Sequence, residues 1–292
     1  MSVIATLWKG AEVTAKLEAA IKEEVALLKA KHILPKLAIV RAGEREDEIS
    51  YERGAMKRCV SLGVDVKNFI LPGTVTQEEL LSAVEAINKD KSIHGALLLR
   101  PLPEDIDDEE VRNALSPDKD VDGITDKSIA SVFTDGFNVG FPPCTPQACM
   151  KILDHYHVDL KGKRVVVVGR SLVVGKPVAM MVLSKDATVT VCHSKTKDMP
   201  ALCREADVLI VAAGRPGMID KHYLSPGQMV IDVGINVNRN GVLCGDVNFA
   251  EAENIVGAIT PVPGGVGSVT TTILAEHVVE AAKRIGRRSA AL

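Results

Sequence analysis

The first hundred residues contain two kinds of hydrophobic pattern. In some segments apolar residues recur at helical spacing among polar ones, and in others they form short continuous runs. Helical spacing, with an apolar residue every three or four positions, predicts helices at 11–28, 46–62 and 76–88. Thr76 and Glu79 have the spacing of a capping box at the start of the third helix. Apolar runs predict strands at 36–40, 64–71 and 94–99. This alternation predicts a small parallel sheet covered by helices.

A second α/β pattern follows a proline-rich stretch. Six prolines lie between positions 101 and 146, and strand-like runs then recur at 163–168, 188–192, 208–212 and 229–233. Helices are expected at 145–157, as the connector, and at 268–285. We therefore predict two α/β domains. A small parallel substrate domain comprises residues 1–144 plus a C-terminal helix of about 268–292, and a doubly wound, Rossmann-like nucleotide domain comprises residues 145–267.

Composition narrows the class of protein. Hydrophobic residues make up 46% and aromatic residues only 3%, so the core must be built from aliphatic side chains, as in buried parallel sheets. The net charge of −3 gives no electrostatic reason to expect nucleic acid or a membrane as a partner. The six cysteines show no metal-binding spacing and are expected to be reduced thiols of a cytoplasmic protein. The uncharged run at 255–275 contains prolines and glycines, which argues against a membrane span.

A glycine-bounded turn follows the buried strand at 165–168. Gly169, Arg170 and Ser171 open a turn that reaches Gly175 at the start of a helix, and such turns place backbone N–H groups against a pyrophosphate. The following strand ends without the carboxylate that usually binds the ribose 2′-hydroxyl of NAD. Arg170 and Ser194 could instead receive a 2′-phosphate, so NADP is favoured over NAD. The alternative is that these are ordinary polar residues at the end of a strand.

Several motifs spread over nearly the whole chain then point to one family. They are Ser50-Tyr51 at a helix entry, Pro101-Leu-Pro103, Pro117-Asp-Lys-Asp-Val-Asp-Gly123, Pro143-Cys-Thr-Pro146, Gly169-Arg-Ser171, Cys192-His-Ser-Lys-Thr196, Asp232-Val-Gly-Ile-Asn236 and Thr260-Pro-Val-Pro-Gly-Gly-Val-Gly267. In this order they resemble the bifunctional methylenetetrahydrofolate dehydrogenase/methenyltetrahydrofolate cyclohydrolase family. The resemblance implies a two-domain subunit, a homodimer and a tetrahydrofolate one-carbon substrate. The choice of NADP as cofactor rests on Arg170 and Ser194, and no metal is expected because the cysteines and histidines lack a metal-binding spacing.

The resemblance also implies roles for individual residues. Asp122 is expected to hold the polar edge of the pterin and is the catalytic candidate, although it could instead form an Asx turn. Tyr51 could stack on the pterin or fill a wall between the domains. The expected substrate-binding residues are Tyr51, Leu99, Arg100, Pro101, Asp122, Pro263, Gly264 and Gly265. The expected cofactor-binding residues are Gly169, Arg170, Ser171, Ser194 and Ile235.

Two positions depart from the family pattern. The family has a lysine four residues after its tyrosine, where this chain has Ala55, and a glutamine before Leu-Pro, where this chain has Leu99. The lysine is essential to the family's cyclohydrolase, and neither a methyl nor an isobutyl group can carry a proton. Arg58 returns to the Tyr51 face of the predicted helix, but an arginine is a poor proton carrier.

Hydride transfer and hydrolysis should respond differently to this loss. Oxidation of the methylene bridge needs mainly positioning, whereas hydrolysis of the methenyl product needs an acid–base group. We therefore predict a dehydrogenase with weak or absent cyclohydrolase activity. The alternatives are a bifunctional enzyme in which water or an arginine replaces the lysine, and a catalytically silent relative that binds folate or a partner.

Overall fold

The computed structural model describes residues 4–134 and 139–290, and these divide into two compact units. The six-stranded unit combines the N-terminal segment up to Ala15 with Thr145–Thr270. The three-stranded unit combines Lys16–Cys144 with the segment that begins at Thr271. Each unit is an α/β structure with a parallel sheet, which agrees with the predicted fold class.

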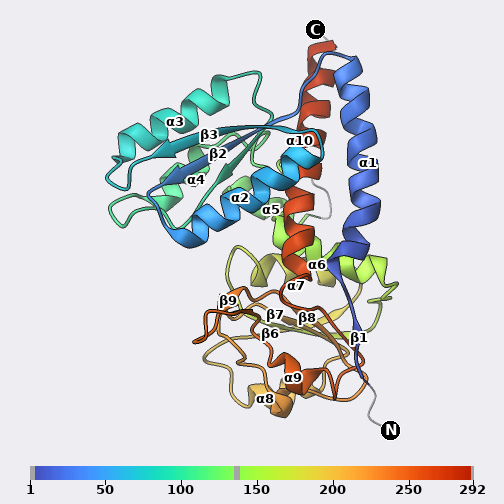
Figure 1. Cartoon of the computed structure of the whole chain (residues 1–292). Coiled ribbons are helices and arrows are strands. Elements are labelled where there is room, and N and C mark those ends of the chain that lie inside the picture. Colours follow the sequence, from blue (N-terminus) through green and yellow to red (C-terminus); the bar gives the residue numbers. More distant parts are fainter. Residues whose placement is uncertain (1–3, 135–138, 291–292) are drawn as a thin grey trace. The chain divides into compact units, whose positions relative to one another are not determined.

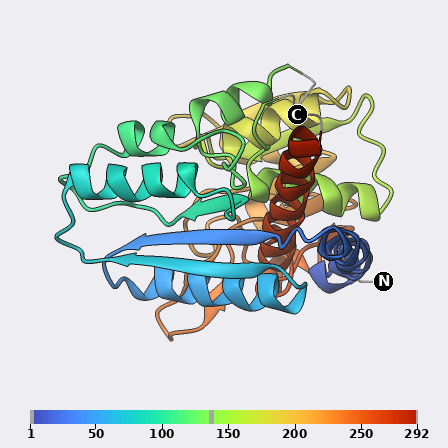
Figure 2. The same cartoon turned by 90° about the horizontal axis from the view of Figure 1, so that it is seen from above.

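In the three-stranded unit, β2 (Lys36–Ala42) lies between β3 (Asp65–Leu71) and β4 (Gly95–Leu98). Helices α2 (Glu46–Ser61) and α3 (Gln77–Lys89) cover opposite faces of this sheet (Figures 1 and 2). The remaining helices of the unit are α4 (Asp108–Ala114), α5 (Asp126–Ser131) and most of α1 (Gly10–Ala30) and α10 (Val266–Ala290). Lys283 of α10 forms an ion pair with Glu24 of α1 at 3.1 Å, which joins these two helices.

The alternation of side chains along β2 explains the two helical layers. Ala38, Val40 and Ala42 belong to one apolar core with Leu80 and Val84 of α3. The residues between them face the other side of the sheet, because successive side chains of a strand point in opposite directions. On that side Arg41 reaches α2 and is held there by a carboxylate. The α2 face is also apolar at Leu37 and Ile39, so the two faces differ in that only this one carries a buried charge on β2.

The six-stranded sheet has the strand order β1-β11-β8-β7-β5-β6, and all of its strand pairs are parallel. Its strands are β1 (Thr6–Leu7), β5 (Arg164–Val168), β6 (Thr188–Cys192), β7 (Val208–Val211), β8 (Met229–Asp232) and β11 (Ala258–Ile259). The helical segments of this unit are α6 (Cys144–His155), α7 (Gly175–Leu183), α8 (Met199–Arg204), η1 (Lys221–Tyr223) and α9 (Phe249–Ala252). A separate hairpin joins β9 (Asn236–Val237) to β10 (Leu243–Cys244).

The N-terminal segment corrects the predicted division of the chain. We expected residues 1–144 to form one domain, but Thr6 and Leu7 pair with Ala258 and Ile259 of β11, which makes β1 an edge of the six-stranded sheet. Both strands have two residues, too few for an apolar alternation to be visible in the sequence. The described C-terminal residues from Thr271 on belong to the three-stranded unit.

The uncharged run at 255–275 contains β11, the loop after it and the first turns of α10. In the part of the chain that the structure describes, no helix is both long and apolar enough to cross a membrane.

Candidate functional site

The turn after β5 has a backbone that only glycine fits. Gly169 has a φ of +128°, and a Cβ atom at this residue would lie 2.2 Å from the carbonyl oxygen of Ala212. A Cβ at Gly175 would lie 2.2 Å from the carbonyl oxygen of Gly169. Both positions therefore have to be glycine for the chain to turn this tightly into α7, a geometry that fits a pyrophosphate held by backbone N–H groups.

Ser171 shapes this turn. Its hydroxyl accepts hydrogen bonds from the backbone N–H of Val174 at 3.1 Å and of Gly175 at 3.4 Å. The side chain of Arg170, in contrast, is exposed. The structure thus assigns Ser171 to the internal support of the turn and leaves the guanidinium of Arg170 accessible to a ligand.

Sheet register brings Arg170 and Ser194 to neighbouring strand ends. Val168 of β5 pairs with Cys192 of β6, and the Gly169 N–H donates to the Cys192 carbonyl at 2.8 Å. Ser194 is exposed two residues beyond that pair. Ile235, which follows β8, is 62% exposed, and its Cδ1 would lie 3.4 Å from a Cβ atom at Gly267.

Two buried aspartates that sequence analysis did not single out fasten the loops at the same edge of the six-stranded sheet. Asp246 accepts from the N–H groups of Ala213, Gly214 and Arg215 at 2.7–2.9 Å, and so fixes the loop after β7. Asp232 accepts from three further N–H groups, and burial raises its pKa to about 6. Asp232 lies in the motif 232–236, but a sequence does not show which backbone groups a carboxylate will bind.

In the three-stranded unit, Asp122 and Tyr51 lie close enough for their charges to interact. Removal from water raises the pKa of Asp122 to about 7, although a hydrogen bond from the Cys144 thiol lowers it. Burial and the charge of Asp122 raise the pKa of the Tyr51 hydroxyl well above its usual value. The structure therefore brings together two of the predicted substrate residues and adds Cys144 to them.

Cys144 belongs to a small buried cluster beneath Asp122. Its Sγ lies 3.2 Å from the carbonyl oxygen of Val121 and 3.7 Å from Nδ1 of His277, which itself is 2.7 Å from the same carbonyl. Sequence analysis treated Cys144 only as a reduced thiol, and His277 is distant in the chain. The Pro-Cys-Thr-Pro motif was the one signal that could have drawn attention to this cluster.

The two departed positions are apolar and buried. Ala55 is fully buried on α2, and Leu99 is 5% exposed just after β4, with its N–H bound to the carbonyl of Val40 at 2.9 Å. Arg100 is held by the carboxylate of Asp108 in a bidentate ion pair, and Pro101 is exposed. Arg58 is held by Glu18, which takes it out of consideration as a substitute for the family lysine.

Pro263, Gly264 and Gly265 lie in the six-stranded unit, unlike the other predicted substrate residues. Gly264 has a φ of +100°, and its carbonyl accepts from the N–H of Gly10 at 2.8 Å. A Cβ at Gly265 would lie 2.5 Å from the carbonyl oxygen of Pro261. The loop therefore requires both glycines for its own conformation, whatever it binds.

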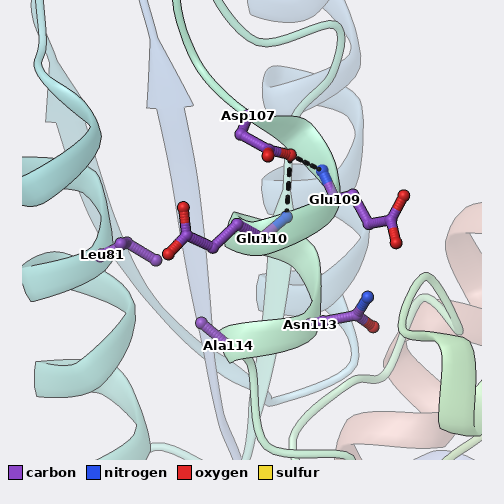
Figure 3. A pocket seen from close by; sticks show the side chains of 6 residues that line it. All are labelled: Leu81, Asp107, Glu109, Glu110, Asn113 and Ala114. Carbon is purple, nitrogen blue, oxygen red and sulfur yellow. Dashed lines mark hydrogen bonds between the residues drawn. The ribbon is translucent and has the colours of Figure 1, made fainter.

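A surface hollow on the three-stranded unit contains none of the predicted site residues. It lies between α3 and α4 and is lined by Leu81, Asp107, Glu109, Glu110, Asn113 and Ala114 (Figure 3). Asp107 is the N-cap of α4, where it accepts from the N–H groups of Glu109 and Glu110. The acidic lining of the hollow is thus explained by the start of α4, and we assign no ligand to the hollow.

The fold and these residues define the chain as a two-unit α/β protein of the dinucleotide-binding class. Family models agree and are more specific. Residues 8–122 match the catalytic domain, and residues 143–286 the NAD(P)-binding domain, of the tetrahydrofolate dehydrogenase/cyclohydrolase family. The chain belongs to this family.

Relatives match over nearly their whole length. The chain is 50% identical over 283 residues to the bifunctional protein FolD of Clostridioides difficile, covering 97% of this chain and 98% of the relative. It is 52% identical over 268 residues to the bifunctional protein FolD of Carboxydothermus hydrogenoformans, covering 90% and 93%.

Solved structures of the family are similar in fold. The bifunctional FolD dehydrogenase/cyclohydrolase of Campylobacter jejuni has a TM-score of 0.93 at 38% identity, over 96% of this chain and 99% of that one. The Trypanosoma brucei enzyme, solved with NADP and an inhibitor, has a TM-score of 0.92 at 35% identity, over 97% and 99%. The predicted family is therefore confirmed. The relatives' names fit the bifunctional alternative better than the predicted loss of the cyclohydrolase.

Proposed function

We propose that this chain oxidises 5,10-methylenetetrahydrofolate to 5,10-methenyltetrahydrofolate by hydride transfer to NADP. The observation that carries the proposal is the tight glycine turn with an exposed Arg170 beside Ser194 at the next strand end. A guanidinium and a hydroxyl suit a 2′-phosphate, and no carboxylate stands among the residues 193–196 that follow β6. The NADP in the related Trypanosoma brucei structure supports this choice of cofactor.

Asp122 and Tyr51 are proposed to bind the pterin. An ionised Asp122 accepts hydrogen bonds from the N–H groups on the polar edge of the ring, and Tyr51 lies close enough to cover a ring held there. Leu99 and Pro101 supply apolar surface at the end of β4, and Arg100 keeps that segment in place through Asp108. Pro263, Gly264 and Gly265 are also proposed to bind the substrate, as the family resemblance implies.

The dehydrogenase step asks little of the protein beyond positioning. NADP, when bound, would supply the acceptor for the hydride of the methylene carbon, and the cation left on the folate would be shared by its two nitrogens. No proton has to leave with the hydride, so the apolar Ala55 and Leu99 are compatible with this step. Orientation of two reactants supplies roughly 7–11 kcal/mol in the best cases, which is ample for such a transfer.

Hydrolysis of the methenyl product is proposed to be retained but weak. The relatives' names support the second activity. The buried Ala55 and Leu99 argue that it is slower than it would be with the family's lysine and glutamine, because the acid–base group at those positions typically contributes about 10²–10⁴-fold. The methenyl product should therefore accumulate. A silent folate-binding relative is disfavoured because the glycine turn, Arg170 and Asp122 are all kept.

We further propose that the chain forms a homodimer, as the family resemblance implies. The hairpin of β9 and β10 carries Val237, Val242 and Leu243, which are 39–64% exposed. Such a cluster of exposed aliphatic side chains is typical of a surface that another chain covers.

The dehydrogenase proposal is tested by supplying 5,10-methylenetetrahydrofolate with either NADP or NAD and recording reduced nicotinamide. We expect reduction with NADP and a much higher KM for NAD. Reduction of neither cofactor would favour the silent relative, and equal KM values would remove the argument from Arg170.

A further inference from the structure

Glu48, in the first turn of α2, is a buried carboxylate that accepts no hydrogen bond from the described residues. Its side chain is 4% exposed. The nearest cation is the exposed Arg45, whose Nε is 3.6 Å from one oxygen. Burial raises the pKa of this carboxyl, as does the charge of Asp47, whereas the charges of Arg45 and Arg41 lower it. A buried polar group without partners is costly, so a structure that keeps one calls for an explanation.

The position of Glu48 supplies that explanation. Glu48, Glu52 and Ala55 lie on the buried face of α2, and Tyr51 is one turn after Glu48. Side chains three residues apart on a helix have Cβ atoms about 5–6 Å apart, so Glu48 and Tyr51 are neighbours. Helical side chains also point back toward the N-terminus, so a lysine at position 55 would extend over the preceding turn, which contains Tyr51. Glu48 therefore stands on the face where the family's proton carrier is missing.

The other ionisable side chain on this face has a different task. Glu52 accepts from Nε of Arg41 at 2.6 Å and from the Asn68 amide at 2.7 Å, which satisfies both of its oxygens. A carboxylate with a purely structural role would be hydrogen-bonded as Glu52 is, and Glu48 is not. Glu52 neutralises a buried arginine and has both oxygens hydrogen-bonded, whereas Glu48 is buried one turn before Tyr51 with no hydrogen bond.

We propose that Glu48 is the acid–base residue for hydrolysis of the methenyl group, which rests on the proposed function. Water forms a C–O bond to the methenyl carbon and gives one proton to the Glu48 carboxylate. Glu48 then passes this proton to the ring nitrogen as the C–N bond breaks. The remaining hydroxyl proton is released to solvent as the formyl C=O forms. The cation and one water thus give a neutral formyl product and one proton, with no oxidation or reduction.

The test supplies preformed methenyltetrahydrofolate and compares its decay with NADPH formation from the methylene substrate. Glu48→Gln should lower the ratio of hydrolysis to NADPH formation about 10²-fold, the lower end of an acid–base contribution. Glu48→Asp should recover part of the ratio. The melting temperature of Glu48→Gln should not fall, because the amide replaces a carboxyl that has no hydrogen bond to lose.

Glu52→Gln is the matched control, one turn along the same face. It should lower the melting temperature, because it weakens a buried ion pair, and leave the ratio unchanged. An unchanged ratio in Glu48→Gln would overturn the proposal, as would wild-type protein that fails to accelerate methenyl decay. If the proposed dehydrogenase function itself were wrong, the wild-type protein would form no NADPH, which distinguishes that failure from the two outcomes above.

Discussion

At the scale of single residues, environment decides what each carboxylate does. Asp246 and Glu52 have their oxygens fully hydrogen-bonded and hold structure, whereas Asp122 and Glu48 are poorly solvated. Sequence motifs identified Asp122, Arg170 and the glycine turn, because backbone and charge requirements are local. They could not identify Glu48, because the burial of a carboxylate without a hydrogen bond arises only from the fold. They could not identify His277 either, because its contact with Cys144 joins residues more than 130 positions apart.

Asp122 leads to a prediction about pH. Its pKa of about 7 means that the carboxyl is mostly protonated below pH 7 and then loses half of its capacity to accept pterin N–H groups. The KM for the folate should therefore rise as the pH falls through about 7. Asp122→Asn should raise the KM and flatten this dependence. Steady-state kinetics from pH 5.5 to 8.5 (about three units spanning the carboxyl pKa) would check it, and an unchanged slope in the variant would contradict the role of Asp122.

Arg170 leads to a prediction about cofactor choice. Removing a guanidinium that binds a phosphate typically costs about 1.5–3 kcal/mol, or roughly 10–100-fold in affinity. Arg170→Ala should therefore raise the KM for NADP by about this factor and change the KM for NAD far less. Equal effects on the two cofactors, measured with the same folate, would show that Arg170 does not bind the 2′-phosphate.

At the scale of elements, helices with clear periodicity and caps were predictable and short strands were not. α3 begins where the Thr76–Glu79 capping box placed it. The hairpin of β9 and β10 was not predicted, because each of its strands has two residues and its single glycine, Gly241, resembles that of any loop. The short helices α4, α5, α8 and α9 were missed for the same reason, as four to seven residues show too little periodicity.

The capping box permits a test of local stability. Thr76→Ala removes the acceptor for the N–H of Glu79 and should lower the free energy of unfolding by about 1 kcal/mol. Chemical denaturation would measure this change. Because Thr76 is remote in the chain from every proposed site residue, the KM values should stay as in the wild type; a large change in them would mean that α3 affects the site.

At the scale of the whole molecule, the class of fold followed from the order of elements, but the division of the chain did not. Pairing of β1 with β11 assigns the N-terminus to the nucleotide-binding unit, and this pairing joins residues about 250 positions apart. Neither this strand pairing nor the lack of hydrogen bonds to the buried Glu48 carboxylate is visible in the sequence. The family motifs, in contrast, span both units and were sufficient to predict the family.

The exposed hairpin gives a prediction for assembly. Val237→Lys places a charge within the exposed aliphatic cluster and should shift a dimer toward monomer in light scattering at micromolar concentration. Val60→Lys is the matched control, because Val60 is equally exposed, at 61%, on α2 of the other unit. A wild-type monomer, or equal effects of the two variants, would contradict the proposed interface.

The most direct test of the account follows NADPH and methenyltetrahydrofolate together in one reaction of the wild-type protein with 5,10-methylenetetrahydrofolate and NADP. The account predicts that methenyl product first builds up in step with NADPH and then decays faster than it does without enzyme. NADPH formation without any build-up of methenyl product would show that hydrolysis keeps pace with oxidation, and would contradict the weak cyclohydrolase inferred from Ala55 and Leu99.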